Sequence, residues 1–267
     1  MFDPKLEALA HDCRVSAKAD TLPVPLEAIC AHEEIRLVPL DTHRGFNGKI
    51  EFIGEENVFL IYHPSLSNHP APNRVRFSIA HELGHFYIDE HRAALVKGIT
   101  HDSKPGFRSK DPMEVQADEF AASLLIPRNL MEPRIDRRGM LYLSEILDIA
   151  GKCSTSPYAT TIRYVRMASE VCWVVLAKEG IIESSFSSDE ARAKGLGKIT
   201  ATKLPAQSPG LSFKGPAPTH EPIEKEHEAT AWLTPKWKVP NIWEHCIAAG
   251  KGYSLSLLAM NDDCDSR

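Results

Sequence analysis

The sequence predicts an α+β protein built from three consecutive parts. Apolar residues recur at helical spacing within residues 3–34, and two β-rich runs at 50–53 and 57–62 flank a polar turn. From residue 170 onwards, short runs of alternating apolar side chains predict strands. We therefore expect an N-terminal domain with a small mixed sheet over residues 1–135, a helical segment over 136–169, and a small α+β domain over 170–267.

The composition excludes several classes of protein. At 267 residues, 43% of them hydrophobic, the chain can form one large core or two modest ones. It has neither an apolar run of about 18 residues nor a signal peptide at its N-terminus. Six scattered cysteines without a CxxC pair are typical of free thiols in a reducing cytosol. We therefore predict a cytoplasmic protein without a membrane partner.

A short motif at residues 81–85, HELGH, follows the predicted strands. On a helix, residues four apart share a face, so His81 and His85 can hold one metal ion with two imidazoles. Glu82 lies about 100° round the same turn, where a carboxylate can act as a general base. The alternative is a buried helix with two hydrogen-bonded histidines. The opposite face of the helix is apolar and contains Ile79, Leu83, Phe86 and Tyr87.

The first candidate for a third metal ligand is His91. It lies six residues after His85, which is the spacing of the metzincin pattern. That pattern has a glycine where this chain has Ile88, and a β-branched side chain resists the positive φ that such a turn often needs. We therefore expect His91 to be exposed or to support the site near the end of the helix.

The second candidate for a third ligand is Glu114, in a helix that the sequence delimits well. Asp111 is a good N-cap, Pro112 suits the first helical position, and Pro127 stops the helix. Glu114 and Asp118 are four residues apart, so a carboxylate ligand and a carboxylate that orients a ligating histidine share one face. A local capping role for Glu114 is the alternative, and the neighbouring HELGH motif favours the metal.

The middle segment and the C-terminal domain carry weaker signals. Two helices over 141–168, broken at 151–157, predict a helix-turn-helix-like pair whose small excess of basic residues favours packing or partner docking over DNA contact. Beyond them, the sequence predicts a hairpin over residues 171–186 and a long loop over 204–222. It also predicts two further strands, at 229–233 and 253–259, and a short helix at 241–248.

The two metal motifs together resemble the ImmA/IrrE family of metallopeptidases. The similarity covers residues 76–85, RFSIAHELGH, and the later positions Glu114, Ala117, Asp118, 120–122 and 124–127. It implies a zincin-like metallopeptidase domain with a gluzincin-type site. Residues 143–166 resemble the helix-turn-helix-like segment of the family, and the region from 170 resembles the GAF-like sensor of its longer members.

From these observations we predict a zinc-dependent endopeptidase in which His81, His85 and Glu114 bind one Zn²⁺ per chain. Two imidazoles, a carboxylate and a water suit zinc best, and another divalent ion such as Mn²⁺ is an alternative. Glu82 is then the general base, and Asp118 orients a ligating histidine. The oxyanion or substrate contacts are open among three residues: Tyr62, His63 and His91.

Two segments are candidates for substrate contact. Residues 57–62 would hold an extended substrate if they form an edge strand, and the alternative is an ordinary core strand. Residues 100–110, which contain Pro-Gly and several basic side chains, predict a loop that is either a substrate lid or a solvated connector.

The resemblance also implies a substrate. It is a separate helix-turn-helix repressor of the XRE type, cleaved under stress or induction to release transcription. The alternative functions are a DNA-binding or sensor protein and a toxin–antitoxin component, each with a non-proteolytic metal site. The presence of Glu82 argues against them, because a purely structural site has no use for a base there.

Overall fold

The computed structural model describes residues 3–41, 48–65, 71–98, 111–132, 141–213, 215, 217–219 and 221–260. The chain divides into two compact units: residues 2–128 together with 151–156, and residues 129–150 together with 157–267. Both units combine helices with a sheet, so the fold is α+β as the sequence predicts. The predicted separation of a helix-turn-helix-like segment at 136–169 as its own domain stays a prediction, as does the loop at 100–110, which lies outside the described residues.

Two helices of the N-terminal unit begin at side-chain caps that the sequence supplies. Asp3 and Asp111 each accept a hydrogen bond from the backbone N–H two residues on, and a proline follows each of them at the first helical position. The predicted helix with Glu114 is thereby confirmed. The helices of this unit are α1 (Pro4–Ser16), α2 (Leu26–His32), α3 (Pro72–Tyr87), α4 (Asp89–Val96) and α5 (Pro112–Leu125).

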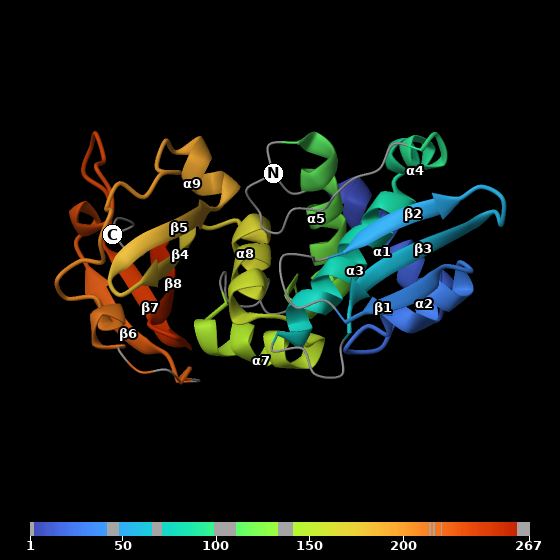
Figure 1. The fold of residues 1–267 in the computed structure, drawn as a ribbon. Helices are drawn as coiled ribbons and strands as arrows, with labels where there is room; N and C mark the ends of the chain where they lie inside the picture. The colour runs from blue at the N-terminus through green and yellow to red at the C-terminus, as the bar shows by residue number, and fades with distance from the viewer. Residues whose placement is uncertain are drawn as a thin grey trace. The chain divides into compact units, whose positions relative to one another are not determined.

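Helices α3 and α5 form the centre of this unit and lie side by side, as the teal and green helices of Figure 1 show. Helix α1 packs against α5, and the buried Arg14 of α1 donates hydrogen bonds to the carbonyl oxygens of Ser123 and Leu124 at 3.0 and 3.4 Å. A cation at the carboxyl end of a helix binds its free carbonyl groups and opposes its dipole. Arg14 therefore secures the end of α5, the helix that carries Glu114.

The small sheet of this unit is mixed, as predicted. Its strands are β1 (Arg36–Leu40), β2 (Lys49–Ile53) and β3 (Val58–Pro64), in the order β1-β3-β2. β1 runs parallel to β3, and β2 runs antiparallel to it. Residues 58–62 thus belong to a central strand, which is the core-strand alternative, and the prediction that residues 57–62 form a substrate-binding edge was wrong. The reason is β1, which the sequence analysis did not predict and which occupies the other side of β3.

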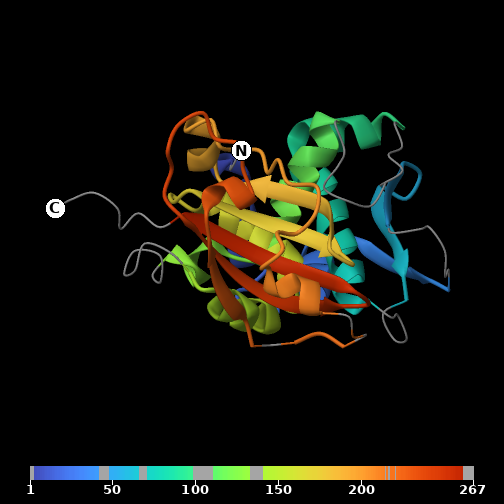
Figure 2. The same ribbon diagram turned by 90° about the vertical axis from the view of Figure 1, so that its left-hand side faces the viewer.

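The C-terminal unit contains a five-stranded antiparallel sheet in the order β5-β4-β8-β7-β6. In Figure 2 the gold strands β5 and β4 lie beside the red strands β8 and β7. One face packs on a core that includes Trp173, Trp232 and Leu258, and α8 (Pro157–Met167) packs against β4 and β5. The strands are β4 (Cys172–Lys178), β5 (Ile181–Ser187), β6 (Ile223–His227), β7 (Ile242–Gly250) and β8 (Tyr253–Met260).

Two elements of the C-terminal unit differ from the sequence predictions. The predicted helix at 241–248 is strand β7, and the predicted strand at 229–233 contains the short 3₁₀ helix η3 (Ala229–Ala231). β7 lies between β8 and β6 and is buried along most of its length, so its side chains show no polar–apolar alternation. A short apolar run of this kind does not distinguish a strand from a helix.

The remaining elements connect these units or lie within them. They are α7 (Leu143–Cys153), α9 (Asp189–Ala193) and the 3₁₀ helices η1 (Arg128–Leu130) and η2 (Pro209–Ser212). The two predicted helices within 141–168 are confirmed as α7 and α8. Five cysteines, at positions 13, 30, 153, 172 and 246, are free and buried in the described structure, as the sequence predicts. No helix among the described residues is long and apolar enough to cross a membrane.

Candidate metal centre

Helices α3 and α5 bring the predicted metal ligands together. The Nε2 atoms of His81 and His85 lie 3.2 Å apart. Glu114 of α5 reaches both rings, with its Oε2 atom 3.4 Å from Nε2 of His81 and its Oε1 atom 3.3 Å from Nε2 of His85. These three residues offer ligand atoms that all lie within 4.8 Å of one another, so one ion could contact all of them.

A close approach between the two helix backbones makes this convergence possible. A Cβ atom at Gly84 would lie 3.1 Å from the Cα atom and 3.2 Å from the carbonyl oxygen of Ala117. Only glycine leaves room for so short a distance between backbones. The sequence analysis did not assign a role to Gly84 or Ala117. The signal that could have found them is a small residue on each helix next to the predicted ligands.

Asp118 lies where the sequence analysis expected it. The Nδ1–H group of His81 donates a hydrogen bond to Oδ1 of Asp118 at 2.9 Å. With the Nδ1–H group held by Asp118, Nε2 is the ring nitrogen that faces Glu114, and it can serve as a metal ligand once it has lost its proton. Both residues are buried, so the bond is shielded from competing water.

The charges of the cluster favour a bound cation. Burial alone lowers the pKa of His81, but hydrogen bonds to Asp118 and Glu114 and the nearby charge of Glu82 outweigh it and raise this pKa to about 10. Burial alone raises the pKa of Glu114, but the hydrogen bonds and charges of the two imidazoles hold it well below its usual value. The carboxylates therefore stabilise positive charge between them, whether it is a proton or a metal ion.

Glu82 is completely buried beside the start of strand β2. A Cβ atom at Gly48 would lie 3.1 Å from Oε1 and 3.3 Å from Cγ of Glu82. Gly48 directly precedes β2, so the start of this strand lies against the carboxylate. Sequence reasoning did not identify Gly48, because nothing in the local pattern connects it to a residue 34 positions away.

The other predicted contact residues lie on β3 and α4. His63 is 6% exposed, and its Nδ1–H group donates to the carbonyl oxygen of Pro64 at 2.8 Å; Tyr62 is half-buried. His91, on α4, is 1% exposed. Of the two expectations for this residue, exposure at the surface is therefore wrong. Its Nε2–H group donates to Oε1 of Gln116 at 3.0 Å, and its ring lies against that of His85.

The donor set of this cluster suits zinc. Two imidazole nitrogens and one carboxylate oxygen are the protein ligands of a catalytic zinc site, which leaves a fourth position for water or substrate. The hydrogen-bonded aspartate behind one histidine is a regular companion of such sites. The residues present thus fit a zinc ion.

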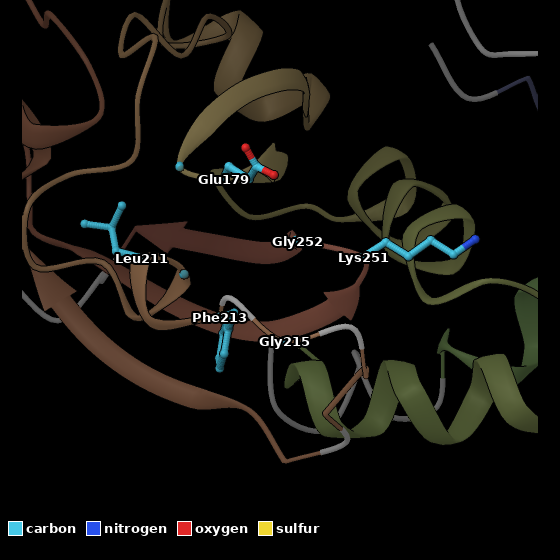
Figure 3. A pocket seen from close by; sticks show the side chains of 8 residues that line it. Glu179, Leu211, Phe213, Gly215, Lys251 and Gly252 are labelled. Atoms are coloured by element: carbon cyan, nitrogen blue, oxygen red, sulfur yellow. The ribbon is translucent and has the colours of Figure 1, made fainter.

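A second concave feature lies in the C-terminal unit, between hairpin turns and η2 (Figure 3). Its charged residues are Glu179 and Lys251, both exposed, and the Lys251 side chain points away from Leu211 and Phe213. No convergent set of polar groups gives it a chemistry among the residues that line it. These residues are Glu179, Gly180, Gly210, Leu211, Phe213, Gly215, Lys251 and Gly252.

Comparisons with known proteins agree with this geometry. Residues 65–144, which contain HELGH, Glu114 and Asp118, match the family model described as IrrE N-terminal-like domain. The chain is 24% identical over 207 residues to the radiation response metalloprotease IrrE of Deinococcus radiodurans. That match covers 75% of this chain but 57% of the relative, so it spans little more than half of the relative's length.

A solved structure described as a Mycobacterium tuberculosis transcriptional regulator has a similar fold. The TM-score is 0.59 at 12% identity, over 97% of this chain and 77% of that one, and a similarity at this identity shows the fold alone. The N-terminal unit has a zincin-like fold with a histidine and glutamate cluster on two packed helices. Residues 65–144 of the chain thus resemble the N-terminal domain of the IrrE-type metallopeptidases.

Proposed function

We propose that this protein is a zinc-dependent endopeptidase with its metal bound by His81, His85 and Glu114. The observation that carries the proposal is the convergence of these three side chains with Glu82 on the same turn of α3 as His81. A structural zinc site has its four positions filled by protein, whereas this one has three ligands and an acid–base group beside them.

The roles of the protein groups follow from their positions. A zinc ion bound here would activate a water molecule and polarise the carbonyl group of a peptide. Glu82 accepts the proton of the attacking water and passes it to the nitrogen of the leaving amine. Asp118 holds the imidazole of His81 in the tautomer and orientation that the site requires. Of the predicted oxyanion partners, Tyr62 is half-buried, whereas His63 and His91 are buried.

Strand β2 supplies a place for an extended substrate. In the described sheet it pairs only with β3, and Gly48, just before its start, lies so near Glu82 that an added Cβ atom would be 3.1 Å from Oε1. A peptide that pairs with the free edge of β2 would lie extended beside the general base. Such docking requires a segment that leaves its own fold, and this ordering cost limits cleavage of neighbouring proteins.

We further propose that the substrate is a separate helix-turn-helix repressor, and that its cleavage releases transcription under stress or induction. The support is the match of residues 65–144 to the IrrE N-terminal-like domain and the similarity to a relative in Deinococcus radiodurans, whose name describes a radiation response metalloprotease. We expect one cut in the repressor, outside its DNA-reading helices or within its dimerisation region, and little activity on casein.

The test compares wild-type protein with Glu82→Gln, which keeps the shape of the side chain but removes the basic carboxylate. Both are loaded with zinc and incubated with casein and with the repressor encoded beside the gene, and the digests are analysed by mass spectrometry. We expect metal content and melting temperature near wild type for Glu82→Gln and a loss of cleavage of about 10²-fold or more. Scattered cuts in casein with an intact repressor would indicate a general peptidase.

One observation favours a second candidate function, a regulatory metal site without proteolysis. Glu82 is fully buried in this conformation, and a general base must reach water during turnover. In that case the protein would act as a DNA-binding, sensor or toxin–antitoxin component. Zinc binding by wild-type protein together with no cleavage of either substrate would support this function over the first.

A further inference from the structure

The two histidines of the metal centre are supported in different ways. His81 is oriented by its hydrogen bond to Asp118. His85 is completely buried and has two other imidazole rings beside it. The ring centroid of His81 lies 4.9 Å from that of His85, and the ring centroid of His91 lies 5.0 Å from it, with the His91 ring tilted by 41°. The ring of His91 therefore packs against the ring of His85.

His91 is itself held firmly. It is 1% exposed, and its Nε2–H group donates to Oε1 of Gln116 at 3.0 Å. Gln116 lies on α5, two residues after Glu114. His91 also lies close to α3 along the chain, because Ile88 is both the C-cap of α3 and the N-cap of α4, the helix that carries His91. The ring thus joins α4 to α5 directly beside His85.

An imidazole needs such support because its ring turns readily. The χ2 angle of histidine has a broad, roughly two-fold distribution, so the Cα position alone does not aim the Nε2 atom. A metal ligand has to hold this atom near one direction, and groups that touch the ligand supply the restraint. For His85, a neighbouring ring that is fixed by its own hydrogen bond restricts this rotation.

We propose that His91 is a positioning residue, which restricts the rotation of the His85 ring and is held in turn by Gln116. The inference rests on the proposed function in one respect, that His85 binds a metal ion. His91 does not bind the ion in this arrangement, because its Nε2–H group is directed to Gln116. It is also not among the described residues whose ligand atoms converge.

The test uses cobalt as well as zinc, because the visible absorption of Co²⁺ reports ligand geometry. We expect His91→Ala to weaken zinc binding about tenfold or more, in competition with a chromophoric chelator, and to change the Co²⁺ spectrum. His91→Phe keeps a ring beside His85 but loses the hydrogen bond, so a smaller change should follow. Gln116→Ala should resemble His91→Phe, since both leave a ring that is no longer held.

Two variants of α4 separate positioning from general stability. Leu95 is buried on the same helix, so Leu95→Ala should lower the melting temperature while the Co²⁺ spectrum stays as in wild type. Glu90 is exposed, and Glu90→Ala should change neither property. The two variants are compared at equal loss of melting temperature. If Leu95→Ala then shows the same change in the Co²⁺ spectrum as His91→Ala, His91 has a merely structural role.

The outcomes distinguish this inference from the proposed function. If wild-type protein binds zinc and cobalt but His91→Ala has an unchanged spectrum and affinity, the positioning role is overturned and the metal centre stands. If His91→Ala loses the metal completely while Glu114→Ala retains it, His91 is a ligand and the role is likewise overturned. A wild-type protein that binds neither ion overturns the metal centre and the positioning role together.

Discussion

The N-terminal and C-terminal units each bury a polar cluster that combines histidine with glutamate. In the C-terminal cluster, Oε1 of Glu244 accepts hydrogen bonds from Ser208 and Ser256 at 2.8 and 2.7 Å. Its Oε2 atom accepts from Nε2 of His227 at 2.8 Å. These residues are all buried, and the carboxylate is surrounded by donors. This cluster completes its own hydrogen bonding.

The N-terminal cluster is arranged differently. Two imidazoles and a carboxylate offer ligand atoms that all lie within 4.8 Å of one another, so one cation could contact all three. Such a cluster is suited to hold a cation, whereas in the C-terminal cluster three side chains already donate to the carboxylate. The comparison teaches that residue type alone does not define a metal site. The direction of the lone pairs and the supply of donors decide it.

The largest effect should be a loss of stability when the C-terminal cluster around Glu244 is broken. Glu244→Ala removes the acceptor for His227, Ser208 and Ser256, and the free energy of unfolding should fall by about 3–5 kcal/mol. Glu244→Gln keeps the volume and one acceptor atom and should cost less. Chemical denaturation measures both. A loss below about 1 kcal/mol for Glu244→Ala would mean that the cluster contributes little to stability.

The next effect concerns the ligand that α5 contributes. Glu114→Ala should lower zinc affinity by more than about 100-fold, because a ligand is lost and not merely an orienting group. Equilibrium dialysis with metal analysis measures the change, and Glu244→Gln serves as the control with wild-type affinity. Glu114→Ala with undiminished zinc would remove it from the ligand set and reopen the choice of His91.

A smaller effect is expected for the carboxylate behind His81. Asp118→Ala leaves all three ligands but removes the hydrogen bond that fixes the His81 tautomer. Zinc affinity should fall by about 10- to 100-fold, less than for Glu114→Ala. The same dialysis experiment gives the comparison. Equal losses for both variants would suggest that Asp118 binds the ion directly.

The smallest effect should appear in catalysis alone. The added methyl group in Gly48→Ala would lie 3.1 Å from Oε1 of Glu82 and displace it by a few tenths of an ångström. We expect kcat/KM to fall by about tenfold at unchanged zinc content, because small misplacements of a catalytic group are costly. Gly54→Ala, whose new methyl group meets only the Phe52 ring at 3.8 Å, is the matched control. Unchanged activity of Gly48→Ala would show that Glu82 tolerates the contact.

Local features of the sequence predicted much of the site. The four-residue spacing of His81 and His85 specifies a shared helix face, and Asp111 with Pro112 specifies where α5 begins. The same spacing relates Glu114 to Asp118. Each of these features depends on interactions within one or two turns of a helix, so a short stretch of sequence is sufficient to read it.

Long-range packing decided the rest. β1 pairs with β3 and excludes substrate from residues 57–62, and β7 is a strand because β8 and β6 lie on both sides of it. The close approach of Gly84 to Ala117, and that of Gly48 to Glu82, exist only once segments far apart in the chain have come together. The sequence by itself determined which groups could bind a metal and on which helix faces they lie. Only the tertiary structure decided how closely those helices approach and which neighbours hold each ligand, because contacts between segments far apart in the chain leave no periodic pattern in the residues around them.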